Sequence, residues 1–300
     1  LLKKGWLRLT NPPAAGTTAR SKVLTPEQEV VMAKLKPSLE KSQYTVWLLH
    51  GVTASGKTEV YLQAIQQVID SGRQAIMLVP EIALTRHVEQ IFQARFSRLA
   101  VLHSQVPDGE RYQNWQRIRQ GYAQVVLGTR SALFAPVNRL GLIILDEEHE
   151  STYKQEETPR YHAREVALAR ARQEKATVIL GSATPSLESY YKALTGEYRL
   201  LAMPSRIAPA RLPRVRIIDM RQHYRQGRHS AISAELKEAI ATRLRNGQQT
   251  ILFLNRRGYS PVTICRACGQ SIMCPDCAVS LSYHQDSSCF LCHYCDYKQE

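Results

Sequence analysis

Short apolar runs alternate with amphipathic stretches along the first two-thirds of the chain. The stretches at 84–96 and 108–121 place apolar residues at helical spacing. The apolar runs are rich in Val, Ile and Leu, and we predict strands at VWLLH (46–50), AIMLV (75–79), LAVLH (99–103), QVVLG (124–128), LIILD (142–146) and TVILG (177–181). Continuous apolar strands separated by helices indicate an α/β fold, with a parallel sheet covered by helices on both faces.

The pattern also suggests where domains begin and end. A helix is predicted from Leu24, with Thr25 as N-cap and Pro26 in the first turn. Near 200–213 the alternation stops in a Pro/Arg-rich stretch, and it resumes with predicted strands at 215–219 and 250–254 around a helix at 233–247. We predict four segments: 1–22, the end of an upstream domain and a linker; 23–204, an α/β lobe; 205–262, a linker and the start of a second lobe; and 263–300, a cysteine-rich region.

Length, composition and charge narrow the class of protein. The 300 residues are 44% hydrophobic, suit about two domains, and contain no run approaching the roughly 20 apolar residues of a membrane-spanning helix. The first residues show neither a signal peptide nor an initiator Met, so we expect a soluble cytoplasmic piece of a longer protein with no membrane partner. The net charge of +14 is concentrated, with nine Lys/Arg against four Asp/Glu in 1–60 and seven against one in 201–230. Such concentration favours a phosphate-backbone partner over the alternative, a solvated basic loop.

A phosphate-binding loop follows the first predicted strand. The sequence fits G-x-x-x-x-G-K-[ST], and a helical pattern follows it. Successive backbone N–H groups in such a loop point into one concavity, the Lys reaches the outer phosphates, and the Thr hydroxyl coordinates Mg²⁺. The residues predicted to bind nucleotide are Gly51, Val52, Thr53, Ala54, Ser55, Gly56, Lys57 and Thr58.

Acidic residues follow the strand predicted at 142–146. Asp146 is predicted to hold Mg²⁺, and Glu147 to orient and deprotonate the water that attacks the γ-phosphate. The alternative, a solvated acidic turn, is disfavoured by the phosphate-binding loop around Lys57. D-E-x-H favours a hydrolase over a small-molecule kinase, because a hydrolase needs only water and a base.

The order of these motifs carries a family resemblance. A P-loop, then DEEH (146–149) and GSATPS (181–186), resembles the superfamily 2 helicases. Further strings narrow the resemblance to the PriA family of replication-restart helicases: VPEIALT (79–85), GTRSALFAP (128–136), DEEHESTYKQEETPRYHARE (146–165), ILFLNRRGYSP (251–261) and the cysteine-rich tail. The resemblance implies RecA-like lobes and an ATP- and Mg²⁺-dependent 3′→5′ DNA helicase at stalled forks. It further implies forked and single-stranded DNA, single-stranded-DNA-binding protein and primosomal helicase-loading proteins as partners, at the bacterial nucleoid.

The resemblance also assigns roles to single residues. Gln28 corresponds to the segment that contacts adenine, and Ser182 and Thr184 to the motif that couples hydrolysis to strand movement. Arg130 lies in a segment that touches DNA in related helicases, with a lobe-stabilising arginine as the alternative.

Aromatic and charged residues alternate directly after the acidic motif, at 151–162. Tyr153, Lys154 and Tyr161 are the candidate DNA contacts in this stretch. Base–aromatic stacking contributes about 1–3 kcal/mol per base whatever the base. The stretch resembles the aromatic-rich loop of RecQ- and PriA-type helicases and is predicted to report bound DNA to the ATP site; the alternative is an ordinary surface loop.

All seven cysteines lie between Cys265 and Cys295, in closely spaced pairs that indicate metal rather than disulfides. Cys274, Cys277, Cys292 and Cys295 have the spacing of a structural zinc ribbon. By resemblance, Cys265 and Cys268 share a second Zn²⁺ with a later pair that this chain does not contain. Cys289 is an extra cysteine, with substitution as one of the zinc ligands as the alternative, and His284 and His293 are expected to be bystanders.

One family motif has no counterpart here. The second lobe of such motors supplies an arginine from a GRAGR-like string, and its loss costs on the order of 10³–10⁵ in rate. We therefore expect these 300 residues alone to bind nucleotide and hydrolyse it poorly. Three other readings stay open: a translocase of the same superfamily, a P-loop kinase, and a zinc-dependent DNA-binding adaptor with a vestigial ATP site.

Overall fold

The computed structural model describes residues 23–299, except for short gaps. The gaps are 42, 81–85, 208–213, 222–231, 254–267, 269, 278, 285–288 and 293–294. The predicted remnant at 1–22 lies outside the described residues. The chain forms two compact units, 1–211 and 212–300.

A seven-stranded sheet, parallel throughout, forms the centre of the first unit. Its strands are β1 (Thr45–Gly51), β2 (Gln74–Leu78), β3 (Leu99–Leu102), β4 (Val125–Gly128), β5 (Leu140–Asp146), β8 (Thr177–Ser182) and β9 (Arg199–Met203). All six strands predicted in this unit form, and the α/β fold class is confirmed. The edge strand β9, which pairs with β1, is not among the predicted strands.

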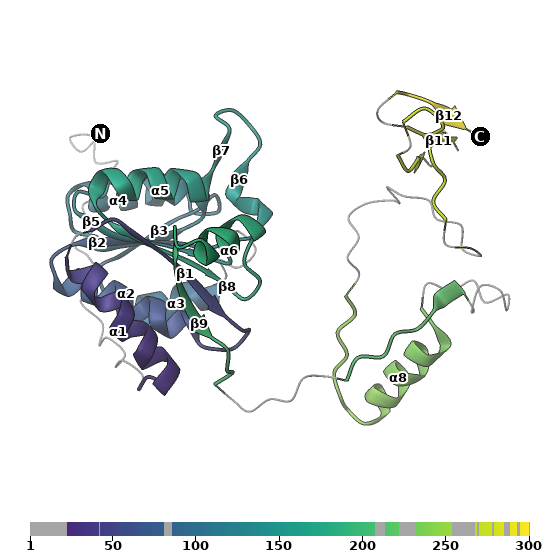
Figure 1. The fold of residues 1–300 in the computed structure, drawn as a ribbon, viewed down its shortest axis with the longest axis horizontal. Coiled ribbons are helices and arrows are strands. Elements are labelled where there is room, and N and C mark those ends of the chain that lie inside the picture. Colours follow the sequence, from purple (N-terminus) through teal and green to yellow (C-terminus); the bar gives the residue numbers. More distant parts are fainter. Residues whose placement is uncertain are drawn as a thin grey trace. The chain divides into compact units, whose positions relative to one another are not determined.

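Helices cover both faces of this sheet (Figure 1). On one face lie α1 (Pro26–Glu40), α2 (Lys57–Asp70) and α3 (Arg86–Arg95). On the other face lie α4 (Asp108–Arg119), α5 (Ala163–Glu174) and α6 (Leu187–Leu194). The start of α1 is fixed as predicted, because Thr25 and Gln28 form a capping box and Pro26 occupies the first turn.

The alternation of side chains along each strand divides the core into two layers. Leu48 belongs to the same buried cluster as residues of α4 and α5, whereas its neighbour Leu49 belongs to the cluster that includes residues of α1 and α2. Both side chains are fully buried. This two-sided burial explains why the strands read as continuous apolar runs.

The strand order β3-β4-β2-β5-β8-β1-β9 brings three motifs to one edge of the sheet. Strand β8 lies between β1, which leads into the P-loop, and β5, which ends at Asp146. Asp146 is in register with Gly181, the first residue of GSATPS. Because parallel strands share a carboxyl-terminal edge, all three motifs meet there.

Two short 3₁₀ helices lie between this edge of the sheet and α5. The 3₁₀ helix η3 (Ser151–Tyr153) follows the acidic motif directly, and the 3₁₀ helix η2 (Arg130–Phe134) follows β4. After η3, the strands β6 (Lys154–Gln155) and β7 (Tyr161–His162) form an antiparallel pair, so the segment 151–162 is a hairpin that runs into α5.

The second unit contains one long helix and a small cysteine-rich sheet. Helix α8 (Ala234–Arg245) begins at its N-cap Ser233, as predicted. The cysteine-rich part pairs β10 (Ser282–His284), β11 (Cys289–Leu291) and β12 (Lys298–Gln299) antiparallel. None of the described helices in either unit is long and apolar enough to cross a membrane.

The strands predicted at 215–219 and 250–254 are wrong for the residues that the structure describes. Neither run pairs with another described segment, and residue 254 itself lies outside the description. Ile217 and Ile251 are 92% and 93% exposed. An apolar run becomes a strand only where a partner supplies backbone hydrogen bonds, and no described neighbour supplies them.

Candidate nucleotide site and zinc site

The P-loop joins the end of β1 to the start of α2. Lys57 Nζ donates to the Gly51 carbonyl oxygen at 2.9 Å, so the lysine lies across its own loop. Gly56 has φ +84°, which a Cβ would strain. A Cβ at Gly51 would come within 2.6 Å of Ser55 Oγ. Both glycines of the motif are therefore required by the shape of the loop.

The interior of the loop suits an anion. Ser55 is 2% exposed, and its Oγ finds no hydrogen-bond partner among the described residues. The loop runs into the N-terminus of the 14-residue helix α2, where backbone N–H groups lack intrahelical acceptors. Thr58 is exposed in the first turn of this helix. These groups fit phosphate oxygens, with Mg²⁺ at the threonine hydroxyl.

Gln28 connects α1 to the P-loop. Its Nε2 donates to the Gly56 carbonyl oxygen at 3.2 Å, and its Oε1 accepts from the backbone N–H of Thr25 at 2.9 Å. The side chain is 2% exposed. In this arrangement one end of the amide holds the loop and the other caps the start of α1, and the predicted contact with adenine is a further role that the structure does not test.

Asp146 and Glu147 face the P-loop across β8. Tyr61 Oη donates to Asp146 Oδ1 at 2.9 Å, and Glu147 Oε1 lies 3.9 Å from Lys57 Nζ. Burial raises the pKa of Asp146 above its usual value, while the hydrogen bond from Tyr61 acts in the opposite direction. Glu147 has φ +47°, a left-handed conformation that is strained for a residue with a Cβ.

Two buried tyrosines hold Asp146 in place. Tyr61 reaches it from α2, and its ring occupies the space that a side chain at Gly181 would need. Tyr153 Oη donates to the Asp146 carbonyl oxygen at 2.7 Å. Tyr153 is 1% exposed, so its ring lies in the core and is not available to stack on a base. The prediction that Tyr153 contacts DNA does not fit this burial; the residue instead ties η3 to the catalytic strand.

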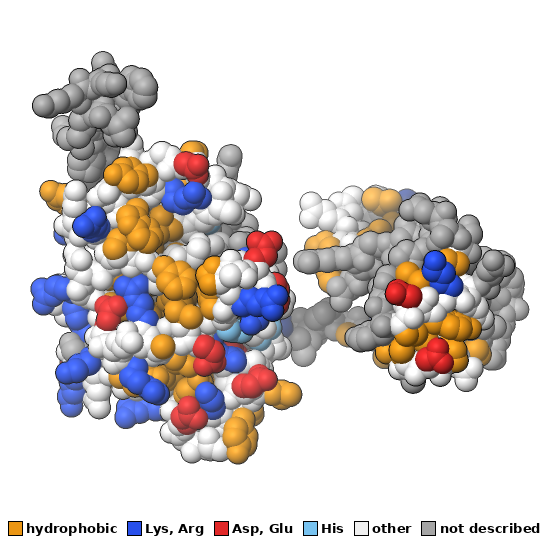
Figure 2. Space-filling model, turned by 90° about the horizontal axis from the view of Figure 1, so that it is seen from above, with side chains coloured by type: hydrophobic (Ala, Val, Ile, Leu, Met, Phe, Trp, Pro, Cys, Tyr) orange, Lys and Arg blue, Asp and Glu red, His pale blue; other side chains and the backbone are white. Residues whose placement is uncertain are grey.

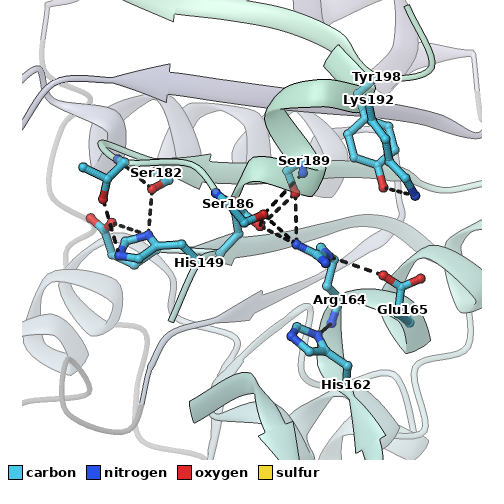
Figure 3. Close-up of polar contacts among 12 residues, drawn as sticks. His149, His162, Arg164, Glu165, Ser182, Ser186, Ser189, Lys192 and Tyr198 are labelled. Atoms are coloured by element: carbon cyan, nitrogen blue, oxygen red, sulfur yellow. Dashed lines mark hydrogen bonds and ion pairs between the residues drawn. The ribbon is translucent and has the colours of Figure 1, made fainter. Parts of the chain in front are cut away.

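Glu148 follows Glu147 in the chain but is buried in a separate polar cluster. Arg164 Nη1 donates to Glu148 Oε2 at 3.0 Å, Ser186 N donates to Oε1 at 2.7 Å, and Ser189 Oγ donates to Oε2 at 2.9 Å. Figure 3 shows Arg164, at the start of α5, pointing toward Ser186 and Ser189 at the start of α6. We call these four residues the Glu148 cluster. It joins the acidic motif, the first turn of α5, the last residue of GSATPS and the first turn of α6.

His149 links the acidic motif to the predicted coupling residues. His149 Nδ1 and Ser182 Oγ are 2.8 Å apart, and His149 Nε2 lies 3.5 Å from Thr184 Oγ1 (Figure 3). Ser182 Oγ also accepts from the backbone N–H of Thr184 at 3.0 Å. Both predicted coupling residues therefore contact His149 of the acidic motif.

Arg130 is hydrogen-bonded to the first part of the 151–162 hairpin. Its Nη1 donates to the carbonyl oxygens of Thr152 and Lys154 at 2.9 and 3.0 Å. Tyr161 is half-buried and meets Phe134 edge-on, with ring centroids 5.2 Å apart. These contacts fit the lobe-stabilising alternative for Arg130, and they leave Tyr161 and Lys154 partly accessible.

Four cysteines gather in the second unit as predicted. The sulfur atoms of Cys274, Cys277, Cys292 and Cys295 all lie within 4.8 Å of one another. Zn–S bonds of about 2.3 Å in a tetrahedron separate the sulfurs by roughly 3.8 Å, and Cys274 Sγ and Cys295 Sγ are 3.6 Å apart. The donor set fits structural Zn²⁺.

The other cysteine and histidine candidates lie apart from these four sulfurs. Cys289 is buried on β11 and Cys268 is exposed, and neither belongs to the group. Cys265, His293 and the side chain of His284 lie outside the described residues.

Several residues of the site are absent from the sequence-based predictions. These are Tyr61, Arg164, Ser186 and Ser189, together with a specific role for Glu148. The sequence offers no periodic signal for them, because their contacts join segments far apart in the chain: Tyr61 and Asp146 are separated by 85 positions.

The comparisons with known proteins agree with this geometry. The DEAD/DEAH box helicase model matches residues 25–193, and the PriA DNA helicase Cys-rich region model matches 274–299. The chain is 47% identical over 277 residues to the replication restart protein PriA of Bacillus subtilis, covering 92% of this chain and 34% of that protein. It is 44% identical over 303 residues to PriA of Synechocystis, covering 98% and 36%.

Solved structures of helicases are similar in part, and one of them serves as an example. The helicase MrfA bound to DNA and AMPPNP superposes with a TM-score of 0.47 at 19% identity, covering 74% of this chain and 32% of that one. The chain spans about a third of the length of its curated PriA relatives. Because the helicase model covers more than half of its residues, the chain belongs to the DEAD/DEAH box helicase family.

Proposed function

We propose that this chain is the ATP-driven motor region and zinc module of a PriA-type replication-restart helicase. The full protein would unwind DNA in the 3′→5′ direction at stalled or abandoned forks and begin primosome assembly there. The observation that carries the proposal is the meeting of Lys57, Asp146 and Glu147 at one sheet edge, in a chain 47% identical to a replication restart protein.

The residues of the site have complementary roles in hydrolysis. The P-loop from Gly51 to Thr58 binds the phosphates, with Lys57 exchanging its carbonyl partner for phosphate oxygens. Thr58 and Asp146 would hold Mg²⁺, which would neutralise charge on the phosphates. Glu147 orients the attacking water and takes its proton. Glu147 Oε1 lies 3.9 Å from Lys57 Nζ, and this distance supports the proposed role.

The hairpin 151–162 provides a path between DNA and this site. Its start is hydrogen-bonded to Asp146 through Tyr153, and its end leads to Arg164, which binds Glu148. A strand that contacts Tyr161 or Lys154 thus acts on a segment anchored at both ends to the acidic motif. Ser182 and Thr184 would pass the nucleotide state in the other direction.

The remaining assignments rest on the family resemblance. We assign 23–204 to the first motor lobe, 205–262 to a linker and the start of the second, and 263–300 to the zinc region, with 1–22 as the end of an upstream domain. Cys265 and Cys268 would bind a second Zn²⁺ together with cysteines farther along. Single-stranded-DNA-binding protein and helicase-loading proteins are the proposed partners, in the cytoplasm at the nucleoid.

The test is ATP turnover by the full-length protein with and without forked DNA. We expect strong stimulation by forks, loss of turnover in Lys57→Ala, and unchanged turnover in Lys36→Ala. Lys36 is a matched control because it lies on α1 with a 60% exposed side chain. Turnover that is indifferent to DNA would overturn the proposal, and so would stimulation without strand separation on forks with a 3′ tail, which would indicate a translocase.

A further inference from the structure

A recess opens on the first unit, apart from the P-loop, between α4 and the 151–162 hairpin. It has a volume of about 700 Å³. Four segments line it: the turn after β3, α4, the start of η2, and the hairpin. The lining residues that matter for the argument are His103, Arg111, Tyr112, Trp115, Arg130 and Tyr161.

Three aromatic side chains meet at this recess. Tyr112 is 57% exposed and Trp115 is 37% exposed, and they lie three positions apart on one face of α4. Tyr161 approaches from the hairpin. In contrast, Trp47 is 5% exposed in the core. Rings that are left accessible beside a hollow are candidates for stacking on a flat ligand.

The charge at the recess is suited to a phosphate. Two arginines line it against one carboxylate, Asp108. Asp108 pairs with Arg111 at 2.8 Å, but the aspartate side chain is 92% exposed. Such surface pairs are worth about 0–1 kcal/mol, so a phosphate can replace the aspartate at little cost. On the face that carries α4, α5 and the hairpin, hydrophobic side chains are interspersed with Lys and Arg (Figure 2).

We infer that this recess binds one unpaired nucleobase of a single DNA strand, packed against both Trp115 and Tyr112, with the adjacent phosphate at Arg111. The inference rests on the proposed function and deepens it by naming where the strand is gripped. The volume lies within the roughly 300–1,000 Å³ of small-ligand sites and admits a nucleotide but not a duplex. A paired base is stacked between its neighbours and cannot enter, so the recess discriminates single strands from duplex.

The position of the recess connects it to the hairpin. Arg130 lines it and donates to the carbonyl oxygens of Thr152 and Lys154. Tyr161 lines it from the other strand of the hairpin. A base bound there touches the segment whose Tyr153 hydroxyl donates to the Asp146 carbonyl oxygen, so occupancy acts on the ATP site through the hydrogen bonds of Arg130 and Tyr153.

The experiment measures the affinity of the full-length protein for a 15-nucleotide oligo-dT by anisotropy of a labelled strand. We expect Trp115→Ala and Tyr112→Ala each to weaken binding roughly 5- to 150-fold, the value of one stacked base. Trp115→Phe keeps a ring and should retain most of the affinity. Tyr122→Ala is the matched control, since Tyr122 is 63% exposed and does not line the recess.

Two further ligands make the test decisive. An oligonucleotide with abasic sites throughout should bind the wild type as weakly as oligo-dT binds Trp115→Ala, and a blunt duplex should bind wild type and variant equally. Equal affinity for abasic and dT strands would overturn the inference, as would an equal loss of duplex affinity in Trp115→Ala. Tyr112→Ala keeps the test valid if Trp115→Ala fails to fold.

The outcomes separate this inference from the proposed function. ATP turnover without DNA should be the same in Trp115→Ala and wild type. If forks stimulate turnover while both ring-removal variants bind oligo-dT like wild type, the motor assignment stands and the base-binding recess is wrong. Tight binding of a small aromatic compound without any effect of DNA would identify a different occupant and would also overturn it.

Discussion

The nucleotide site and the Glu148 cluster begin at adjacent residues but differ in how their polar groups are satisfied. At the nucleotide site, Ser55 Oγ is buried without a partner among the described residues, and Asp146 is partly buried with its pKa raised. In the Glu148 cluster, both carboxylate oxygens accept hydrogen bonds, and the side chain of Glu148 has no exposed surface.

This difference teaches which of the neighbouring acids act on a ligand. A buried polar group without a partner lowers stability, so it persists where a ligand later pairs with it. A fully paired carboxylate has no capacity left for a substrate and instead fixes the segments that contact it. Glu147, between them, has a left-handed backbone conformation. Asp146 and Glu148 on either side of it belong to the nucleotide site and to the Glu148 cluster, respectively.

The largest expected effect concerns the four clustered cysteine sulfurs, which resemble the nucleotide site because their polar atoms suit a ligand. Removing zinc with a chelator should unfold the sheet of β10, β11 and β12, because binding of structural zinc supplies about 10–16 kcal/mol in small modules. Metal content and protease protection of residues 274–299 check this. Nucleotide affinity at Lys57 should not change; a sheet that stays protected after chelation would contradict the assignment.

Glu147→Gln should sharply reduce turnover without destabilising the protein. Loss of a general base costs about 10²–10⁴ in rate. The side chain is 34% exposed, so its replacement disturbs little of the core. Steady-state hydrolysis by the full-length protein with forked DNA is the measurement. Glu150→Gln, with a 31% exposed side chain, is the matched control and should keep its rate. Retention of more than half the rate by Glu147→Gln would exclude it as the base.

Arg164→Ala, unlike Glu147→Gln, should mainly lower the free energy of unfolding. It leaves the buried carboxylate of Glu148 without its cation, and breaking such a pair costs about 3–5 kcal/mol. Urea unfolding measures the change. Lys36→Ala removes an exposed ion pair with Glu40 and should cost about 0–1 kcal/mol. A similarly small loss in Arg164→Ala would show that the Glu148 cluster is not a buried ion pair in solution.

Asp146→Asn should raise stability slightly while abolishing Mg²⁺-dependent hydrolysis. The pKa of Asp146 is raised in the folded protein, chiefly by burial, so its contribution is favourable below the unfolded pKa and is lost as pH rises through the folded pKa. At neutral pH the ionised carboxylate therefore destabilises the fold, and we expect a gain on the order of 1 kcal/mol in the variant.

The pH dependence checks the cause of this gain. Urea midpoints without nucleotide should differ at pH 7.5, and the difference should shrink as pH falls toward the ordinary aspartate pKa near about 4. A constant difference across this range would attribute the gain to packing rather than to ionisation.

The sequence predicted the features that are determined by residues close together in the chain. The six apolar runs predicted strands because both faces of each are buried, and the P-loop was predictable because its shape is set by two glycines and a lysine within eight positions. Strand β9 was missed, since Arg199 and Leu200 are exposed at the sheet edge and dilute the apolar signal.

Contacts between distant segments were beyond the sequence. The side-chain type of Tyr153 suggested stacking, but its burial depends on the packing of η3 against β5 and could not be read from composition. The runs at 215–219 and 250–254 failed for the converse reason: their apolar character is local, whereas a strand needs a partner. The Glu148 cluster depends on residues 16 to 41 positions away.

The contact between Tyr61 and Gly181 has a consequence for how related sequences can diverge. The phenol oxygen of Tyr61 occupies the volume that a methyl group at 181 would fill. A lineage that acquires Ala at 181 must also replace Tyr61 with a shorter side chain, because the ring carbon Cζ alone would lie 2.8 Å from the new Cβ. That replacement removes the hydrogen bond to Asp146. Positions 61 and 181 are therefore expected to change together or not at all. The residue type at one position limits which residue types the other can accept.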